Sequence, residues 1–145
     1  MTRLRQGYGV ASELMNSENL SEFANRYAKA WCSHEPEHVA TFFAANGSLK
    51  INNDAPAVGR AAIATIARGV MGDFPDMTVT FDKLEPCADR IAFHWTLTGT
   101  HAGTGNHVRI SGYELWKIGD TGLIAESSGH FDVAEYERQL KGESL

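Results

Sequence analysis

The sequence predicts an α+β fold, a cone in which helices pack on a strongly curved, mainly antiparallel sheet. Apolar residues recur at helical spacing in the first half of the chain and at every second position in the second half, where short Gly-containing turns separate the runs. The 145 residues, 43% of them hydrophobic, suffice for one core of ordinary size. We therefore expect one domain over residues 18–145, with residues 1–17 as an N-terminal arm that shows no sustained period.

Two helices are expected first. Asn19-Leu-Ser-Glu22 has the pattern of a capping box, and apolar residues then follow at helical spacing as far as Trp31. Pro36 suits the first turn of a second, short helix, which the Asn46-Gly47 pair would end.

A short strand and a third helix should follow. Residues 48–51 have strand character, and residues 52–56 carry turn chemistry. Gly59-Arg60 then opens an Ala-rich helix with apolar residues on one face.

Alternating apolar residues predict a four-stranded meander in the second half. Its runs begin at Met77 and cover residues 91–97, 108–118 and 123–131, and Gly-containing turns at 102–105 and 119–122 link the last three. Links this short imply antiparallel neighbours, and a last short helix is expected over 133–140. A sheet curved in this way encloses a mostly apolar pocket.

The charge pattern excludes several partners. Thirteen Lys and Arg residues stand against eighteen Asp and Glu, a net charge of −5, and the basic residues are scattered, which argues against nucleic acid and anionic membranes. No apolar run approaches the length of a membrane span, the first residues lack a secretory signal pattern, and the two cysteines have no metal-ligand spacing. We expect a cytoplasmic protein.

Several short phrases occur in an order that resembles one family, the SnoaL-like polyketide cyclases of the nuclear transport factor 2-like superfamily. The resemblance covers about residues 18 to 142 and rests on Tyr27-Ala-Lys-Ala-Trp31, Pro36-Glu-His-Val-Ala-Thr-Phe-Phe-Ala44, Gly59-Arg-Ala-Ala-Ile63, Gly99-Thr-His-Ala-Gly103, Gly112-Tyr-Glu-Leu-Trp116, Gly122-Leu-Ile-Ala-Glu126 and His130-Phe-Asp132. It implies a deep pocket, a homodimer formed through the outer face of the sheet, and no metal or organic cofactor. The superfamily also holds ketosteroid isomerase, epoxide hydrolases and non-catalytic binding modules, so the fold alone does not assign a reaction.

Ser128, His130 and Asp132 are the candidates for chemistry, because residues two apart on a strand share a face. The resemblance implies that Asp132 is the acid/base of an intramolecular aldol closure, with His130 as its partner. An apolar pocket would raise the pKa of the carboxyl, which suits removal of a proton next to a carbonyl group. Asp132 also begins a capping box with Glu135, a role that needs no catalysis.

The remaining candidates would bind the ligand. Aromatic side chains can shape a pocket for a planar or hydrophobic molecule, and a polar residue beside the first strand can contact it. The substrate-binding candidates are Tyr27, Trp31, Asn53, Phe74, Trp95, Tyr113 and Ser128. No metal site is expected, since Pro36 separates His34 from His38.

These observations predict a cofactor-independent enzyme that transfers protons, by aldol cyclisation or isomerisation, on a small hydrophobic carbonyl compound. Two alternatives stay open. One is a non-catalytic, dimeric module that binds a small ligand. The other is an epoxide hydrolase-like enzyme, to which Asp132 and Arg109 could contribute, although the second Asp that such a site needs has no obvious place.

Overall fold

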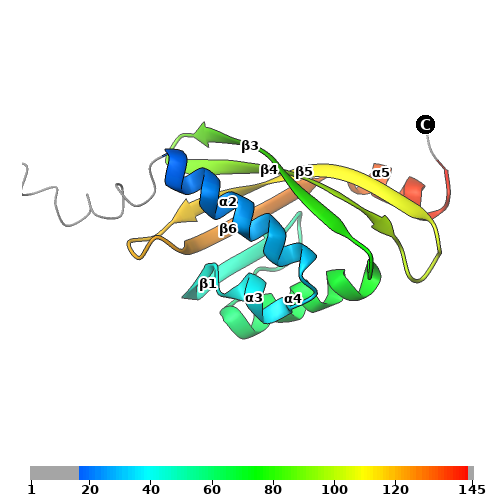
Figure 1. The fold of residues 1–145 in the computed structure, drawn as a ribbon, viewed down its shortest axis with the longest axis horizontal. Helices are drawn as coiled ribbons and strands as arrows, with labels where there is room; N and C mark the ends of the chain where they lie inside the picture. The colour runs from blue at the N-terminus through cyan, green and yellow to red at the C-terminus, as the bar shows by residue number, and fades with distance from the viewer. Residues whose placement is uncertain (1–16, 144–145) are drawn as a thin grey trace, which may run out of the picture.

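A computed structural model of the chain describes residues 17–143 (Figure 1). The predicted arm, residues 1–17, lies outside the described residues except for its last position. The described residues form a six-stranded sheet with helices packed against it, so the predicted fold class is confirmed. In Figure 1 α2 crosses in front of the curved sheet, α3 and α4 lie below α2, and α5 lies at the opposite end of the sheet from the start of α2.

Helix α2, Ser17–Cys32, packs its apolar side on the sheet. Phe23, Tyr27 and Trp31 recur at helical spacing and are all buried. The predicted cap is wrong, because the helix begins at Ser17 and Asn19 lies inside it. Periodicity fixes which side of a helix is buried more firmly than where the helix begins.

The second helix is shorter than predicted. Helix α3 covers Pro36–Ala40, and strand β1, Phe43–Ile51, already contains the Asn46-Gly47 pair that was expected to end the helix. Gly47 has another role: a Cβ there would lie 2.8 Å from the carbonyl oxygen of Ile124. The glycine therefore allows β1 to approach its neighbour where their register shifts.

The sheet has two more strands than the predicted meander. Its order is β2-β1-β6-β5-β4-β3, and β1 runs parallel to β6. The short β2, Ala57–Val58, was not predicted, whereas Gly59 caps α4, Arg60–Asp73, where the sequence placed a helix start. The meander and the last helix are confirmed, as β3 Thr78–Cys87, β4 Arg90–Thr100, β5 His107–Ile118, β6 Ile124–Phe131 and α5 Val133–Leu140.

The core lies between α2 and the inner face of the sheet. The ring of Tyr27 lies 5.3 Å from that of Phe93 and 5.2 Å from that of Trp116, and the Phe93 and Trp116 rings stack at 4.8 Å. All three side chains are almost fully buried. This cluster holds α2 at a fixed distance from β4 and β5, which line the cavity described below.

None of the helices within residues 17–143 is long and apolar enough to cross a membrane.

Candidate functional site

A cavity of about 390 Å³ lies between the inner face of the sheet and helices α2, α4 and α5. Trp31, Phe74 and Trp95, three of the predicted ligand-binding residues, line it. The rest of its apolar wall consists of Leu49, Ile51, Val70, Val79, Phe93, Leu97, Ile110, Phe131 and the Tyr136 ring. The volume would hold a molecule of two or three fused rings, at the lower end of the usual range for ligand pockets.

Glu114 of β5 places a carboxyl group in this apolar wall. Its side chain is buried, and three groups from three different elements hold one of its oxygens. The Tyr27 hydroxyl, the Trp116 indole Nε1 and the Ser127 hydroxyl donate to Oε1 at 2.9, 3.0 and 2.7 Å. Among the described residues none donates to Oε2, so this oxygen is left for a ligand.

Burial raises the pKa of Glu114, although the hydrogen bonds from Trp116, Ser127 and Tyr27 lower it in part. The charged form loses solvation in the cavity wall, and the donors recover only a share of that loss. Burial also raises the pKa of Tyr27 well above its ordinary value, and the charge of Glu114 adds to this effect. Tyr27 therefore keeps its proton and remains a donor to Glu114 whichever form the carboxyl takes.

The opening of the cavity is acidic. Asp54, after β1, and Asp73, at the end of α4, line the cavity and are exposed to solvent, whereas Glu114 is 8% exposed. Asp73 lies close enough to Tyr136 of α5 for its charge to act on the phenol, whose pKa is raised by burial first and by Asp73 second. The cavity thus has one buried carboxyl group in its wall and two carboxyl groups that are exposed to solvent.

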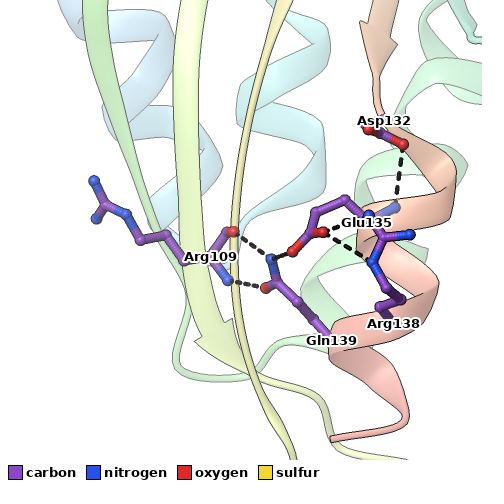
Figure 2. Close-up of polar contacts among 5 residues, drawn as sticks. All are labelled: Arg109, Asp132, Glu135, Arg138 and Gln139. Carbon is purple, nitrogen blue, oxygen red and sulfur yellow. Dashed lines mark hydrogen bonds and ion pairs between the residues drawn. The ribbon is translucent and has the colours of Figure 1, made fainter. Parts of the chain in front are cut away.

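Asp132 does not lie in the cavity. It is exposed, and its Oδ1 accepts a hydrogen bond from the backbone N–H of Glu135 at 3.1 Å, so it caps α5 (Figure 2). The predicted position in a dry pocket is wrong because β6 ends one residue earlier, and the carboxyl turns toward the helix N-terminus instead. A cap of this kind contributes about 1 kcal/mol to stability.

Arg109 does not join Asp132 in an epoxide hydrolase-like arrangement. Its backbone N–H donates to Gln139 Oε1 at 2.6 Å, and its carbonyl oxygen accepts from Gln139 Nε2 at 3.0 Å. Figure 2 shows its guanidinium pointing away from Asp132 and from the side chains of α5. The backbone of Arg109 therefore anchors α5 to β5, and its charged guanidinium lies away from Asp132.

His130 and Ser128 share a face of β6, as predicted, but it is the outer face of the sheet. Ser127, Gly129 and Phe131 face inward, the first bonded to Glu114 and the others lining the cavity. The residues between them face outward. There the Ser128 hydroxyl and His130 Nε2 lie 3.1 Å apart, and His130 stacks on Tyr113 with 4.9 Å between ring centroids. None of the three residues lines the cavity, which contradicts the predicted place of Ser128 and Tyr113 in the ligand pocket and of His130 beside a catalytic Asp132 there.

Two other residues that were predicted to bind the ligand do not line the cavity. Asn53 is exposed in the turn after β1 and does not line the cavity; its neighbour Asn52 accepts a hydrogen bond from the backbone N–H of Phe131 at 3.1 Å. Tyr27 is fully buried and does not line the cavity; it packs against Trp31 and Phe93, which do, and its hydroxyl donates to Glu114. Tyr27 is thus a positioning residue.

Glu114 was not among the candidates, although the sequence contains a signal for it. Val108, Ile110 and Trp116 of β5 occupy alternate positions and are all buried. Glu114 lies in the same alternation, so it is a charged residue on the apolar side of a strand. A buried carboxyl among apolar neighbours marks a candidate site.

Within residues 17–143, no group of His, Cys, Asp and Glu side chains has the geometry to hold a metal ion.

The family model of the SnoaL-like polyketide cyclases matches residues 21–140. The chain belongs to this family. Its predicted membership is confirmed, and its fold is the nuclear transport factor 2-like fold of the related structures. No protein of curated function matches the chain.

Three of the solved structures similar to this SnoaL-like chain have different descriptions. A hypothetical protein with a ketosteroid isomerase-like fold from Catenulispora acidiphila, in complex with trimethylamine, has a TM-score of 0.74 and 19% identity over 83% of this chain and 92% of that one. A putative SnoaL-like polyketide cyclase from Jannaschia sp. has a TM-score of 0.68 and 12% identity over 92% and 91%. SalBIII, an epoxide hydrolase/cyclase-like enzyme of pyran ring formation in the polyether salinomycin, has a TM-score of 0.71 and 14% identity over 83% and 95%. At these identities the similarity establishes the fold and leaves the reaction open.

Proposed function

We propose that the protein is an enzyme that transfers a proton on a small hydrophobic carbonyl compound, with Glu114 as the acid/base. One observation carries the proposal: a carboxyl group with a raised pKa lies in the wall of an apolar cavity, and residues 17–143 hold only one of its oxygens. Asp132, the residue that the sequence favoured for this role, caps a helix at the surface.

The hydrogen bonds define what each oxygen of Glu114 does. Oε1 already accepts from three donors, so a proton on the carboxyl group resides on Oε2. In its ionised form Oε2 takes a proton from the carbon next to a carbonyl group, and the protonated form then returns it to carbon or oxygen of the substrate. The three donors stabilise the carboxylate in a wall that would otherwise strongly oppose a charge.

The family supports proton-transfer chemistry without fixing the reaction. The related solved proteins include a putative polyketide cyclase and an epoxide hydrolase/cyclase-like enzyme, and both descriptions concern ring-forming or ring-opening reactions. Such reactions need a group that removes one proton and delivers another. A buried carboxyl in an apolar cavity can do both, as the carboxyl groups of ketosteroid isomerase illustrate.

The proposal is tested by proton exchange on an enolisable ketone. The protein should accelerate exchange of the α-protons of 2-tetralone for deuterium, followed by NMR in D₂O. Glu114→Gln should lower this acceleration by about 10²–10⁴, the usual contribution of a general acid/base. Gln keeps an acceptor oxygen for the three donors, so the fold is expected to persist, which circular dichroism checks.

Asp132→Asn is the matched control. Asn also caps helices well, so this variant should keep both the stability and the exchange rate of the wild type. Equal exchange rates for the wild type and the Glu114 variant, or no acceleration by the wild type, would contradict the proposal. An exchange rate that falls in Asp132→Asn would instead assign the acid/base role to Asp132, at the end of β6.

A ligand-binding module without catalysis remains the second candidate. The observation that favours it is the network of Glu114 itself, because Tyr27, Trp116 and Ser127 tie α2, β5 and β6 together through this carboxyl. In that case the wild type would bind 2-tetralone and leave its exchange rate unchanged.

A further inference from the structure

The ionisable side chains that line the cavity are all acidic or phenolic. They are Asp54, Asp73, Glu114 and Tyr136, and no Lys, Arg or His among the described residues lines it. A carboxylate or phosphate on a ligand would be repelled by these carboxylates. No positive charge in the lining would compensate for the free energy that it costs to remove the anion from water.

The two carboxylates at the mouth are available for a ligand. No ion pair or side-chain hydrogen bond joins Asp54 or Asp73 to another of the residues 17–143. Both are exposed and both line the cavity. They create a negative potential at the opening that the protein does not neutralise locally.

A row of aromatic rings continues from this mouth into the cavity. Phe74 and Tyr136 have ring centroids 6.4 Å apart, Tyr136 and Phe131 5.6 Å, and Phe131 and Trp95 6.1 Å, all in edge-to-face or steeply inclined arrangements. Aromatic faces beside carboxylates attract alkylammonium groups through cation–π contacts as well as charge.

The buried wall of the cavity offers a ligand one hydrogen-bond acceptor. Glu114 is buried, yet its Oε2 receives no hydrogen bond from the described residues while Oε1 receives three. Oε2 is not among the fully buried unpaired atoms of the described residues, so it is accessible from the cavity that Glu114 lines, where a group on a ligand can donate to it.

We propose that the natural ligand is a hydrophobic molecule with a basic amine, bound with its ammonium group at Asp54 and Asp73 and its apolar body along the aromatic row. The inference deepens the proposed function and rests on it for the carbonyl group, which lies at Glu114. The substrate class is then an amine-bearing ketone or aldehyde, and acidic compounds and phosphate esters are excluded.

Three probes of similar size and different charge test the proposal. They are 2-(2-naphthyl)ethylamine, 2-(2-naphthyl)ethanol and 2-naphthylacetic acid, measured by calorimetry at pH 7 and low salt. We expect the amine to bind most tightly and the acid least tightly. Asp54→Asn and Asp73→Asn should each weaken binding of the amine about two- to fivefold, leave binding of the alcohol unchanged and strengthen binding of the acid. Added salt should reduce the preference of the wild type for the amine.

Asp120→Asn is the control variant. Asp120 is an exposed carboxylate outside the cavity lining, so its removal changes the net charge equally and should leave the amine preference intact. Thermal unfolding of each variant checks the fold.

The proposal is overturned if the acid binds as tightly as the amine, if the double variant of Asp54 and Asp73 keeps the full preference, or if none of the probes binds at millimolar concentration. These results are independent of the exchange of 2-tetralone, which is neutral. If the wild type shows no preference for the amine, but its exchange of 2-tetralone still depends on Glu114, the amine inference alone is rejected. If the wild type prefers the amine, but Glu114→Gln leaves the exchange of 2-tetralone unchanged, the proposed role of Glu114 as acid/base alone is rejected.

Discussion

Glu114 is subject to two opposing effects, burial and hydrogen bonding. Burial raises the pKa of its carboxyl group, and the donors on Oε1 lower it by less. The folded protein therefore binds the Glu114 proton more tightly than the unfolded chain does. Linkage then requires that the stability of the fold depends on pH through this residue.

Comparison of the wild type with Glu114→Gln isolates this dependence. Because the folded pKa lies above the ordinary value of 4.5, the stabilisation from proton binding is complete below pH 4.5 and is lost as the pH rises toward the folded pKa. Between these two values the free energy of unfolding of the wild type should fall by about 1.4 kcal/mol per pH unit relative to the variant.

Urea unfolding at pH 4 to 8 measures this difference, in which the contributions of the other titrating groups cancel. Parallel curves for the two proteins would show that Glu114 is ionised as easily in the fold as outside it, and a wild type that gains stability relative to the variant as the pH rises would show that it is ionised more easily in the fold.

For the individual residues of the site, the sequence predicted the types of residue better than their positions. Trp31, Phe74 and Trp95 line the cavity as expected, because large apolar side chains on the inner faces of elements have few other places to go. Asp132 was misplaced because its pattern fits two roles, and the helix start that follows it decided for the cap. Tertiary contacts, which the pattern does not contain, bring Tyr27 and Ser127 to Glu114.

Among the elements, β5 depends on a glycine that makes room for the cavity wall. A Cβ on Gly112 would collide with the carbonyl oxygen of His130 and would lie 2.6 Å from Cζ2 of Trp95. The indole of Trp95 thus packs against bare backbone, which positions one side of the aromatic row. Gly69 in the middle of α4 is the opposite case, since its Cβ would meet nothing within 4 Å.

These two glycines predict opposite effects of alanine. Gly112→Ala should lower the free energy of unfolding by about 1–3 kcal/mol, because the methyl group forces backbone and Trp95 to move. Gly69→Ala should raise it by about 0.5–1 kcal/mol, because alanine has less conformational freedom to lose in a helix. Urea unfolding of both variants checks the pair, and a Gly112 variant as stable as the wild type would contradict the packing described here.

The elements that the sequence predicted well are those with strong periodicity. Strands β4 and β5 and helix α5 follow from alternation or helical spacing within the segment itself. Of strand β1 only the second half, residues 48–51, was predicted, because its first half pairs in an irregular register with β6, about eighty residues later in the chain, and its Gly47 resembles a helix end. Long-range pairing of this kind leaves little trace in local sequence.

For the molecule as a whole, the two faces of the sheet have different roles. The inner face carries the core and the cavity with its carboxyl groups. The outer face carries polar and aromatic side chains, among them the stacked Tyr113 and His130 and the pair of His94 and Glu85 at 3.0 Å. The expected homodimer through this outer face, and the cytoplasmic location, stay predictions.

The chemistry proposed for the molecule depends on the state of one carboxyl group at the inner end of the cavity. The most direct measurement is a pH titration of the Glu114 side-chain carboxyl by NMR on protein labelled with ¹³C in glutamate, with Glu114→Gln to assign the signal. We predict that this carboxyl titrates with a pKa above 4.5 and that a bound ketone shifts its resonance. A signal that titrates at or below 4.5 and ignores the ketone would contradict the proposed role of Glu114.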